Sequence, residues 1–134
     1  IKLPHSDAWG LLMRADDALA ERASVRPQDL DGLALLCSRQ AVQSNELAGW
    51  LGREFGELDI VATYNLIHNA TYMVEAGMGC AVSIEGLVNT SGTGLVFRPF
   101  EPSLTARLSF AWKRGRQLSR AAAEFLKLLQ SKIG

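Results

Sequence analysis

Short apolar runs alternate along this chain with stretches in which apolar residues recur at helical spacing. Leu33–Cys37 is continuously apolar and lies between Gly32 and Ser38, which is typical of a short strand buried on both faces. Residues 65–76 instead form an apolar stripe every three or four positions and stop at Gly77. That spacing predicts an amphipathic helix closed by a glycine in the left-handed conformation.

The same two patterns recur through the rest of the chain. We expect strands at residues 9–13, 33–37, 58–63, 79–83, 95–97 and 108–112, and helices at 27–32, 44–54, 65–76 and from 119 onward. Because strands alternate with helices, the sequence predicts an α/β fold with a largely parallel sheet. Ser44 is the expected cap of the second helix and Ser119 that of the last. The buried stripe expected on the last helix consists of Ala122, Phe125, Leu126, Leu129 and Ile133.

Composition fits one globular domain with a real core. The chain has 134 residues, of which 48% are hydrophobic and 21% charged. Its 14 Lys and Arg equal its 14 Asp and Glu, so the formal net charge is zero. Segments that bind duplex DNA usually carry an excess of basic residues, so we do not expect this segment to bind the phosphates of DNA. No apolar stretch reaches the roughly 18 residues that span a bilayer.

The polar residues that follow two of the predicted strands are the candidate binding site. In a parallel sheet, ligands bind at the carboxyl ends of strands, where helix N-termini converge. Ser38, Arg39 and Gln40 follow the strand of residues 33–37, and Thr63, Tyr64 and Asn65 end or follow the strand of residues 58–63. Free amides, hydroxyls and a guanidinium there would suit a carboxylate ligand.

Simpler roles remain open for several of these residues. Arg39 could pair with an acid at the surface, and Asn65 could be an ordinary helix cap. The strand of residues 9–13 could line the site, although packing in the core is the expected role.

Other chemistry finds little support in the sequence. His5 and His68 are far apart, with no cysteine or carboxylate at metal-ligand spacing, and no G-x-S-x-G elbow surrounds a serine. The glycines of Gly77-Met78-Gly79 end a helix, whereas a dinucleotide fingerprint opens one. Cys37 and Cys80 lie in apolar runs, as buried, reduced thiols do. We therefore expect no catalytic residue, metal or cofactor.

Four segments of the chain, taken in order, resemble elements of one known protein family. Residues 9–20 resemble that family's strand and "D-x-P-L-A" element, with Ala18 where proline is usual. Residues 29–36 are similar to its "dL-x-g-x-p-l-i" segment, and 73–81 to its "V-x-x-G-x-G-i-a" element. Residues 95–100, followed by a strand ending at Trp112-Lys113 and a closing helix, complete the set. Together the four segments resemble the effector domain of LysR-type transcription regulators, and the resemblance covers nearly the whole chain.

The resemblance implies a type II periplasmic-binding-protein-like domain, with one complete Rossmann-like lobe and part of a second. Residues 1 to about 36 and about 114 to 134 would belong to the first lobe, and residues 37 to about 113 to the second. An N-terminal winged helix-turn-helix and the opening part of the first lobe would be missing, so the chain looks like a fragment.

The function implied is cytoplasmic sensing of a small-molecule effector in the cleft between lobes, with no reaction catalysed. DNA would be bound only through the missing N-terminal domain. A homodimer or tetramer is expected, since the family pairs through this domain and an incomplete lobe would expose apolar surface. A stand-alone solute-binding protein of the same architecture is the alternative, and a small α/β enzyme is a weaker one.

Overall fold

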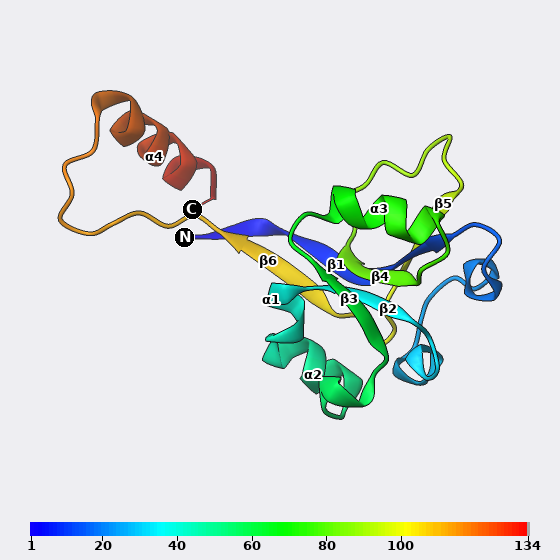
Figure 1. The fold of residues 1–134 in the computed structure, drawn as a ribbon. Coiled ribbons are helices and arrows are strands. Elements are labelled where there is room, and N and C mark those ends of the chain that lie inside the picture. The colour runs from blue at the N-terminus through cyan, green and yellow to red at the C-terminus, as the bar shows by residue number, and fades with distance from the viewer. Residues whose placement is uncertain (134) are drawn as a thin grey trace. The chain divides into compact units, whose positions relative to one another are not determined.

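A computed structural model describes residues 1–133, and for Phe55 the backbone alone. The chain divides into two compact units (Figure 1). The larger unit comprises residues 7–106, and the smaller unit residues 1–6 with 107–134. The lobe boundaries expected from the sequence stay a prediction, since compact packing groups residues 7–36 with the residues that follow them.

The regular elements fall close to the expected positions. The strands are β1 (Lys2–Arg14), β2 (Leu35–Ser38), β3 (Ile60–Tyr64), β4 (Cys80–Ile84), β5 (Leu95–Pro99) and β6 (Thr105–Ser109). The helices are α1 (Arg39–Val42), α2 (Asn45–Leu51), α3 (Ile67–Glu75) and α4 (Arg120–Ile133), with 3₁₀ turns at Ala18–Glu21, Pro27–Leu30 and Phe55–Glu57. The α/β alternation read from the sequence is therefore confirmed. The expected left-handed glycine after α3 is also confirmed, because Gly77 has a φ of 79°.

The sheet is mixed, which corrects the largely parallel sheet expected from the sequence. Its strand order is β3-β2-β4-β1-β5, and β6 pairs with β1. β2 is parallel to β3 and to β4, because helices carry the chain back between those strands. β1 runs antiparallel to β4 and to β5. No helical crossover links it to either, so alternation along the chain could not reveal its direction.

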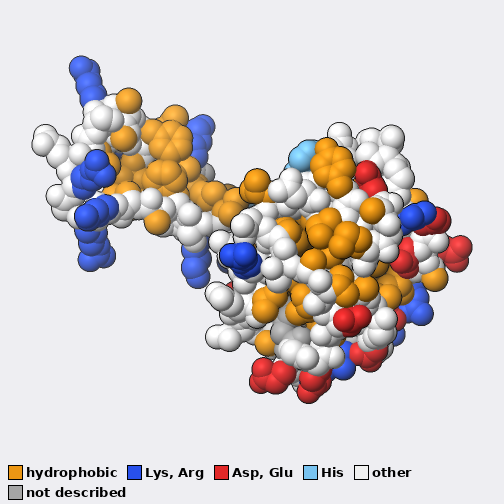
Figure 2. All heavy atoms as spheres, in the orientation of Figure 1, with side chains coloured by type: hydrophobic (Ala, Val, Ile, Leu, Met, Phe, Trp, Pro, Cys, Tyr) orange, Lys and Arg blue, Asp and Glu red, His pale blue; other side chains and the backbone are white. Residues whose placement is uncertain are grey.

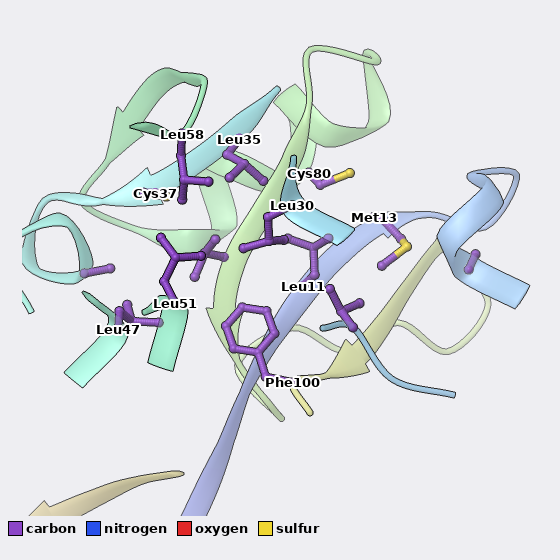
Figure 3. Packing of buried hydrophobic residues seen from close by; sticks show 14 residues of the cluster. Leu11, Met13, Leu30, Leu35, Cys37, Leu47, Leu51, Leu58, Cys80 and Phe100 are labelled. Atoms are coloured by element: carbon purple, nitrogen blue, oxygen red, sulfur yellow. The ribbon is translucent and has the colours of Figure 1, made fainter. Parts of the chain in front are cut away.

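Side chains alternate between two apolar clusters of the larger unit, as the period of a strand requires. Leu11 and Met13 belong to one cluster, while Leu12 between them belongs to the other. The same division separates Leu35 from Leu36 on β2. The first cluster is the larger, and Figure 3 shows leucines from β1, β2 and α2 in it, together with Phe100.

The smaller unit is held by strand pairing and a loose aromatic group. The terminal amine of Ile1 donates to the carbonyl oxygen of Phe110 at 2.9 Å, beside the pairing of β6 with β1. The ring centroids of Phe110 and Phe125 are 5.6 Å apart. The strand expected at 108–112 lies earlier, because Phe110–Trp112 has no regular structure.

The expected buried stripe of α4 is wrong. None of its described residues is buried, and the side chain of Phe125 is 53% exposed. Ala122 is exposed as well, whereas Leu126, Leu129 and Ile133 are half-buried. The periodicity found the apolar face correctly but could not say that so little of the described chain covers it.

Helix caps follow the sequence in one helix and depart from it in two. Ser119 Oγ accepts from the amide of Ala122 at 3.2 Å, which confirms the cap of α4. Ser44 holds the cap position of α2, but its side chain makes no capping bond. Asn65 is not a cap, since Leu66 precedes the first residue of α3.

Within residues 1–133, no helix has the length and hydropathy that a membrane crossing requires.

Candidate functional site

A cavity of about 470 Å³ opens on the larger unit where β2, β3 and β4 end. Strand ends and the first residues of helices provide most of its wall, as expected for strands that share a direction. Its lining residues are Trp9, Ser38, Gln40, Ala41, Ser44, Tyr64, Asn65, Leu66, Ile67, Ser83, Ile84 and Leu87. All these side chains are neutral, and about half of them are apolar.

Ser38 is the last residue of β2 and the cap of α1. Its Oγ accepts from the amide of Ala41 at 3.0 Å, and Ala41 is itself buried. Because that bond uses the oxygen as acceptor, the hydroxyl hydrogen of Ser38 remains able to donate. The chain therefore turns from strand to helix with a hydrogen-bond donor at the cavity wall.

Tyr64 ends β3, and its phenol extends toward the neighbouring strands. The hydroxyl donates to the carbonyl oxygen of Val82 at 2.6 Å. Burial, assisted by the nearby Cys37 thiol, raises the pKa of Tyr64 to about 12. The phenol is therefore neutral at physiological pH, and its oxygen can accept a hydrogen bond from a ligand while its own hydrogen is donated to the carbonyl oxygen of Val82.

The N-terminus of α3 faces the same space. Leu66 and Ile67 both line the cavity, and no side chain caps this helix. The first backbone amides of a helix have no partner within it, and they carry its partial positive charge. In the described chain, the side chains of Gln40, Ser44 and Asn65 make no hydrogen bond either. The wall thus offers several donors that the protein itself leaves unused.

Trp9 contributes the aromatic part of the wall from β1. Its indole ring lines the cavity and also packs against the larger apolar cluster. The indole Nε1 is buried and has no acceptor, which is uncommon for a buried polar group. The strand of residues 9–13 was expected to be core, and Leu11, Leu12 and Met13 are buried. Trp9 is the residue of that strand that reaches the cavity.

Four of the six residues predicted from the sequence meet at this cavity. Ser38, Gln40, Tyr64 and Asn65 line it together, whereas Arg39 and Thr63 are exposed and lie outside its lining. Arg39 makes no ion pair within residues 1–133, so the surface pairing considered for it is not seen.

Sequence reasoning missed the contribution of β4. Ser83 and Ile84 complete the wall, and Leu87 follows in the next loop. The rule that ligands bind at the carboxyl ends of parallel strands identified Ser38 and Tyr64, and it applies equally to β4. The sequence at the carboxyl end of β4 was therefore the available signal. No group of residues suited to a metal ion occurs among the described residues.

Comparisons with known proteins give a consistent picture of this chain. Residues 4–134 match a family model described as the LysR substrate binding domain. The chain resembles the solved structure of HinK, a LysR family regulator from Pseudomonas aeruginosa, with a TM-score of 0.71 and 16% identity. That likeness covers 100% of this chain and 48% of HinK, so the chain spans about half the length of that protein.

Two further solved structures share the fold. The effector-binding domain of QuiR, in complex with shikimate, is 13% identical with a TM-score of 0.79, over 99% of this chain and 65% of that one. The reduced form of OxyR is 21% identical with a TM-score of 0.70, over 98% and 62%. At such identities the likeness concerns the fold. Among curated protein sequences, none matches this chain.

Proposed function

This chain belongs to the LysR substrate-binding domain family, and from that premise we propose that its neutral cavity is part of the site where a small-molecule effector binds. The fold is that of LysR effector domains, which are type II periplasmic-binding-protein-like and belong to a non-enzymatic family. The observation that carries the proposal is the convergence of Ser38, Tyr64 and the uncapped start of α3 on one cavity.

The chemistry of the wall suits a small molecule with an apolar body and a group rich in acceptors. Trp9, Ile67 and Leu87 offer apolar contact, while Ser38, Gln40 and Asn65 offer hydrogen-bond donors. A carboxylate is a suitable acceptor, since hydroxyls, amides and a helix N-terminus all bind that group. The QuiR effector domain binds shikimate, which supports a small-molecule effector for this chain also.

In the intact regulator, we expect the effector to bind in the cleft between two lobes and to favour one arrangement of them. A ligand shifts such an equilibrium only when it binds one arrangement better than the other. That change would control DNA binding by an N-terminal winged helix-turn-helix. We place the regulator in the cytoplasm, as a homodimer or tetramer. The family match favours this function over a stand-alone solute-binding protein, and a winged helix-turn-helix encoded upstream would decide between them.

Isothermal titration calorimetry of the chain against a panel of small metabolites, carboxylic acids among them, tests the proposal. For a metabolite that binds, Asn65→Ala and Gln40→Ala should each weaken binding about tenfold, the value of one good hydrogen bond to a polar ligand. Arg39→Ala is the matched control and should change affinity less than about twofold, because Arg39 lies outside the cavity lining.

Two results would count against this site. One is binding that survives both cavity substitutions unchanged. The other is binding that is lost in Arg39→Ala, which would restore Arg39 to the role predicted from the sequence and move the site away from the cavity.

A further inference from the structure

β4 carries a buried hydroxyl next to residues that are otherwise apolar. Ser83 follows Cys80-Ala81-Val82 on this strand, lines the cavity and is only 3% exposed. Within the described residues, Ser83 and Thr71 are the buried polar side chains. Thr71 Oγ1 donates to the carbonyl oxygen of His68 at 2.6 Å, whereas Ser83 Oγ lies 3.4 Å from the carbonyl oxygen of Ile84. That distance is long for a hydroxyl donor, so Ser83 is the less satisfied of the two.

Ser83 and Tyr64 form an acceptor pair, because the protein already uses the hydrogens of both hydroxyls. Tyr64 donates its hydrogen to the carbonyl oxygen of Val82 at 2.6 Å. Ser83 has one hydrogen, which it donates to Ile84 or to the phenol of Tyr64. Burial raises the pKa of Tyr64, and the hydrogen bond with Ser83 opposes that rise, as a bond accepted by a phenol oxygen does. Among the described residues, no group donates to Ser83 Oγ, so its two lone pairs are free to accept.

The first residues of the helices give another part of the same wall the opposite polarity. Ser38 Oγ accepts from the amide of Ala41, which leaves its hydroxyl hydrogen free to donate. The first amides of α3 are donors without a partner inside the helix. One part of the wall therefore donates hydrogen bonds while the acceptor pair receives them. A ligand that satisfies both must carry an acceptor group and a separate donor group.

The absence of charge in the lining restricts what the donor group of the ligand can be. The cavity lining contains no Asp, Glu, Lys, Arg or His. Tyr64 is neutral as well, because burial raises its pKa to about 12. A buried ammonium group without a carboxylate partner would lose its hydration uncompensated, whereas a hydroxyl needs only one acceptor. The wall therefore favours a hydroxyl over an amine as the donor.

We propose that the effector is a cyclic carboxylic acid bearing a hydroxyl group, and that Ser83 selects it by accepting the hydrogen bond of that hydroxyl. A ring suits the cavity of about 470 Å³, where the indole of Trp9 and the side chain of Ile67 offer flat and apolar contact. Tyr64 is a positioning residue, since it receives the hydrogen of Ser83. This inference rests on the proposed function of the cavity. The two fail separately, because an acid without a hydroxyl would still bind the donors of the wall.

Calorimetric titration of the chain with matched ring acids tests the selection. The probes are benzoate, its ortho-, meta- and para-hydroxy derivatives, para-aminomethylbenzoate, and cyclohexanecarboxylate with its hydroxy derivatives. At least one hydroxy acid should bind about tenfold more tightly than its parent acid, and the aminomethyl compound should bind more weakly than benzoate. In Ser83→Ala the preference for the hydroxy acid should fall below about twofold, while the parent acid keeps its affinity. Ser83→Cys should behave in the same way, because a thiol fills the space but is a weak acceptor.

Thr63→Ala is the matched control, because it removes a hydroxyl from β3 that is exposed and lies outside the cavity lining. It should keep the full preference for the hydroxy acid. The inference is overturned if parent and hydroxy acids bind equally, if the preference survives in both Ser83 variants, or if the control loses it too. Equal binding of parent and hydroxy acids would leave the proposed function standing, whereas no binding by any of the acids would overturn both. Circular dichroism must show that each variant remains folded.

Discussion

Two cysteine thiols and one phenol of the larger unit are neutral because they are buried. Burial raises the pKa of the Cys37 thiol and of the Cys80 thiol from 9.0 to about 12, and Asp17 adds to the effect at Cys80. The pKa of Tyr64 rises for the same main reason. A thiol that stays protonated is a poor nucleophile and a poor metal ligand, so these cysteines act as core residues.

These shifts predict loss of stability in alkali. A thiol whose pKa is higher in the folded state stabilises that state fully below pH 9, and the contribution disappears as the pH rises to about 12. The free energy of unfolding, measured by urea denaturation, should therefore fall steadily above pH 9. C37A/C80A should be less stable at pH 7, because of the cavities it creates, but should show a shallower fall.

A decline of the same steepness in C37A/C80A would assign the alkaline transition to other groups. Tyr64 remains in that variant, so some decline above pH 10 is expected there too. The comparison of slopes, rather than of absolute stabilities, is what isolates the thiols.

At the scale of the element, two serines occupy equivalent places with different effect. Ser38 caps α1 through a hydrogen bond to the amide of Ala41, whereas Ser44 precedes α2 without one. Ser38→Ala should therefore lower the free energy of unfolding by about 1 kcal/mol, the usual value of an N-cap. Ser44→Ala should change it by less than about 0.5 kcal/mol. Thermal or urea denaturation of both variants provides the measurement, and equal effects would contradict the cap assignment.

The contrast between these serines shows what sequence patterns can and cannot predict about elements. Periodicity located most strands and helices of the larger unit within a few residues, because apolar positions recur differently in strands and in helices. It missed α1, whose four residues are too few to show a helical period. Caps depend on the conformation of one residue. Ser44 therefore holds the cap position of α2 without making a capping bond, and Leu66 rather than Asn65 precedes α3. The reversed direction of β1 depends on partners distant in sequence.

At the scale of the whole molecule, the two units should differ in local stability. β2 and β4 contribute fully buried residues to the core, whereas no described residue of α4 is buried. An isolated helix of this length is marginal in water. Among the helices and strands, hydrogen exchange of the dilute monomer should therefore be slowest in residues 35–37 and 80–82 and fastest in residues 120–133. Equal protection of α4 in the dilute monomer would contradict this division.

The smaller unit holds eight Lys and Arg and one acid, and Figure 2 shows the blue basic side chains around it. This charge separation escaped sequence analysis, since a total of zero says nothing about where the charges lie. The signal available in the sequence was the continuous segment of residues 107–132, which is rich in Lys and Arg and contains a single acid.

About the candidate site, the sequence predicted the location better than the chemistry. The strand-end rule identified Ser38 and Tyr64, both now at the cavity. Arg39 was expected to provide a positive charge to the site, but it lies outside the cavity lining. Consecutive residues at the end of a strand place their side chains in different directions. The wall is neutral because the Arg39 side chain lies outside it. The hydrophobic periodicity of a sequence does not predict where such an individual side chain points.

Trp9 gives this wall an optical property. An indole is a fluorophore whose emission depends on its immediate surroundings, and Trp9 is the tryptophan that lines the cavity, while Trp50 stacks on Phe100 and Trp112 belongs to the smaller unit. With the other two replaced by phenylalanine, the emission of the chain would report on one place alone. The receptor therefore carries its own probe, and a compound that enters the cavity can be detected by light without any label.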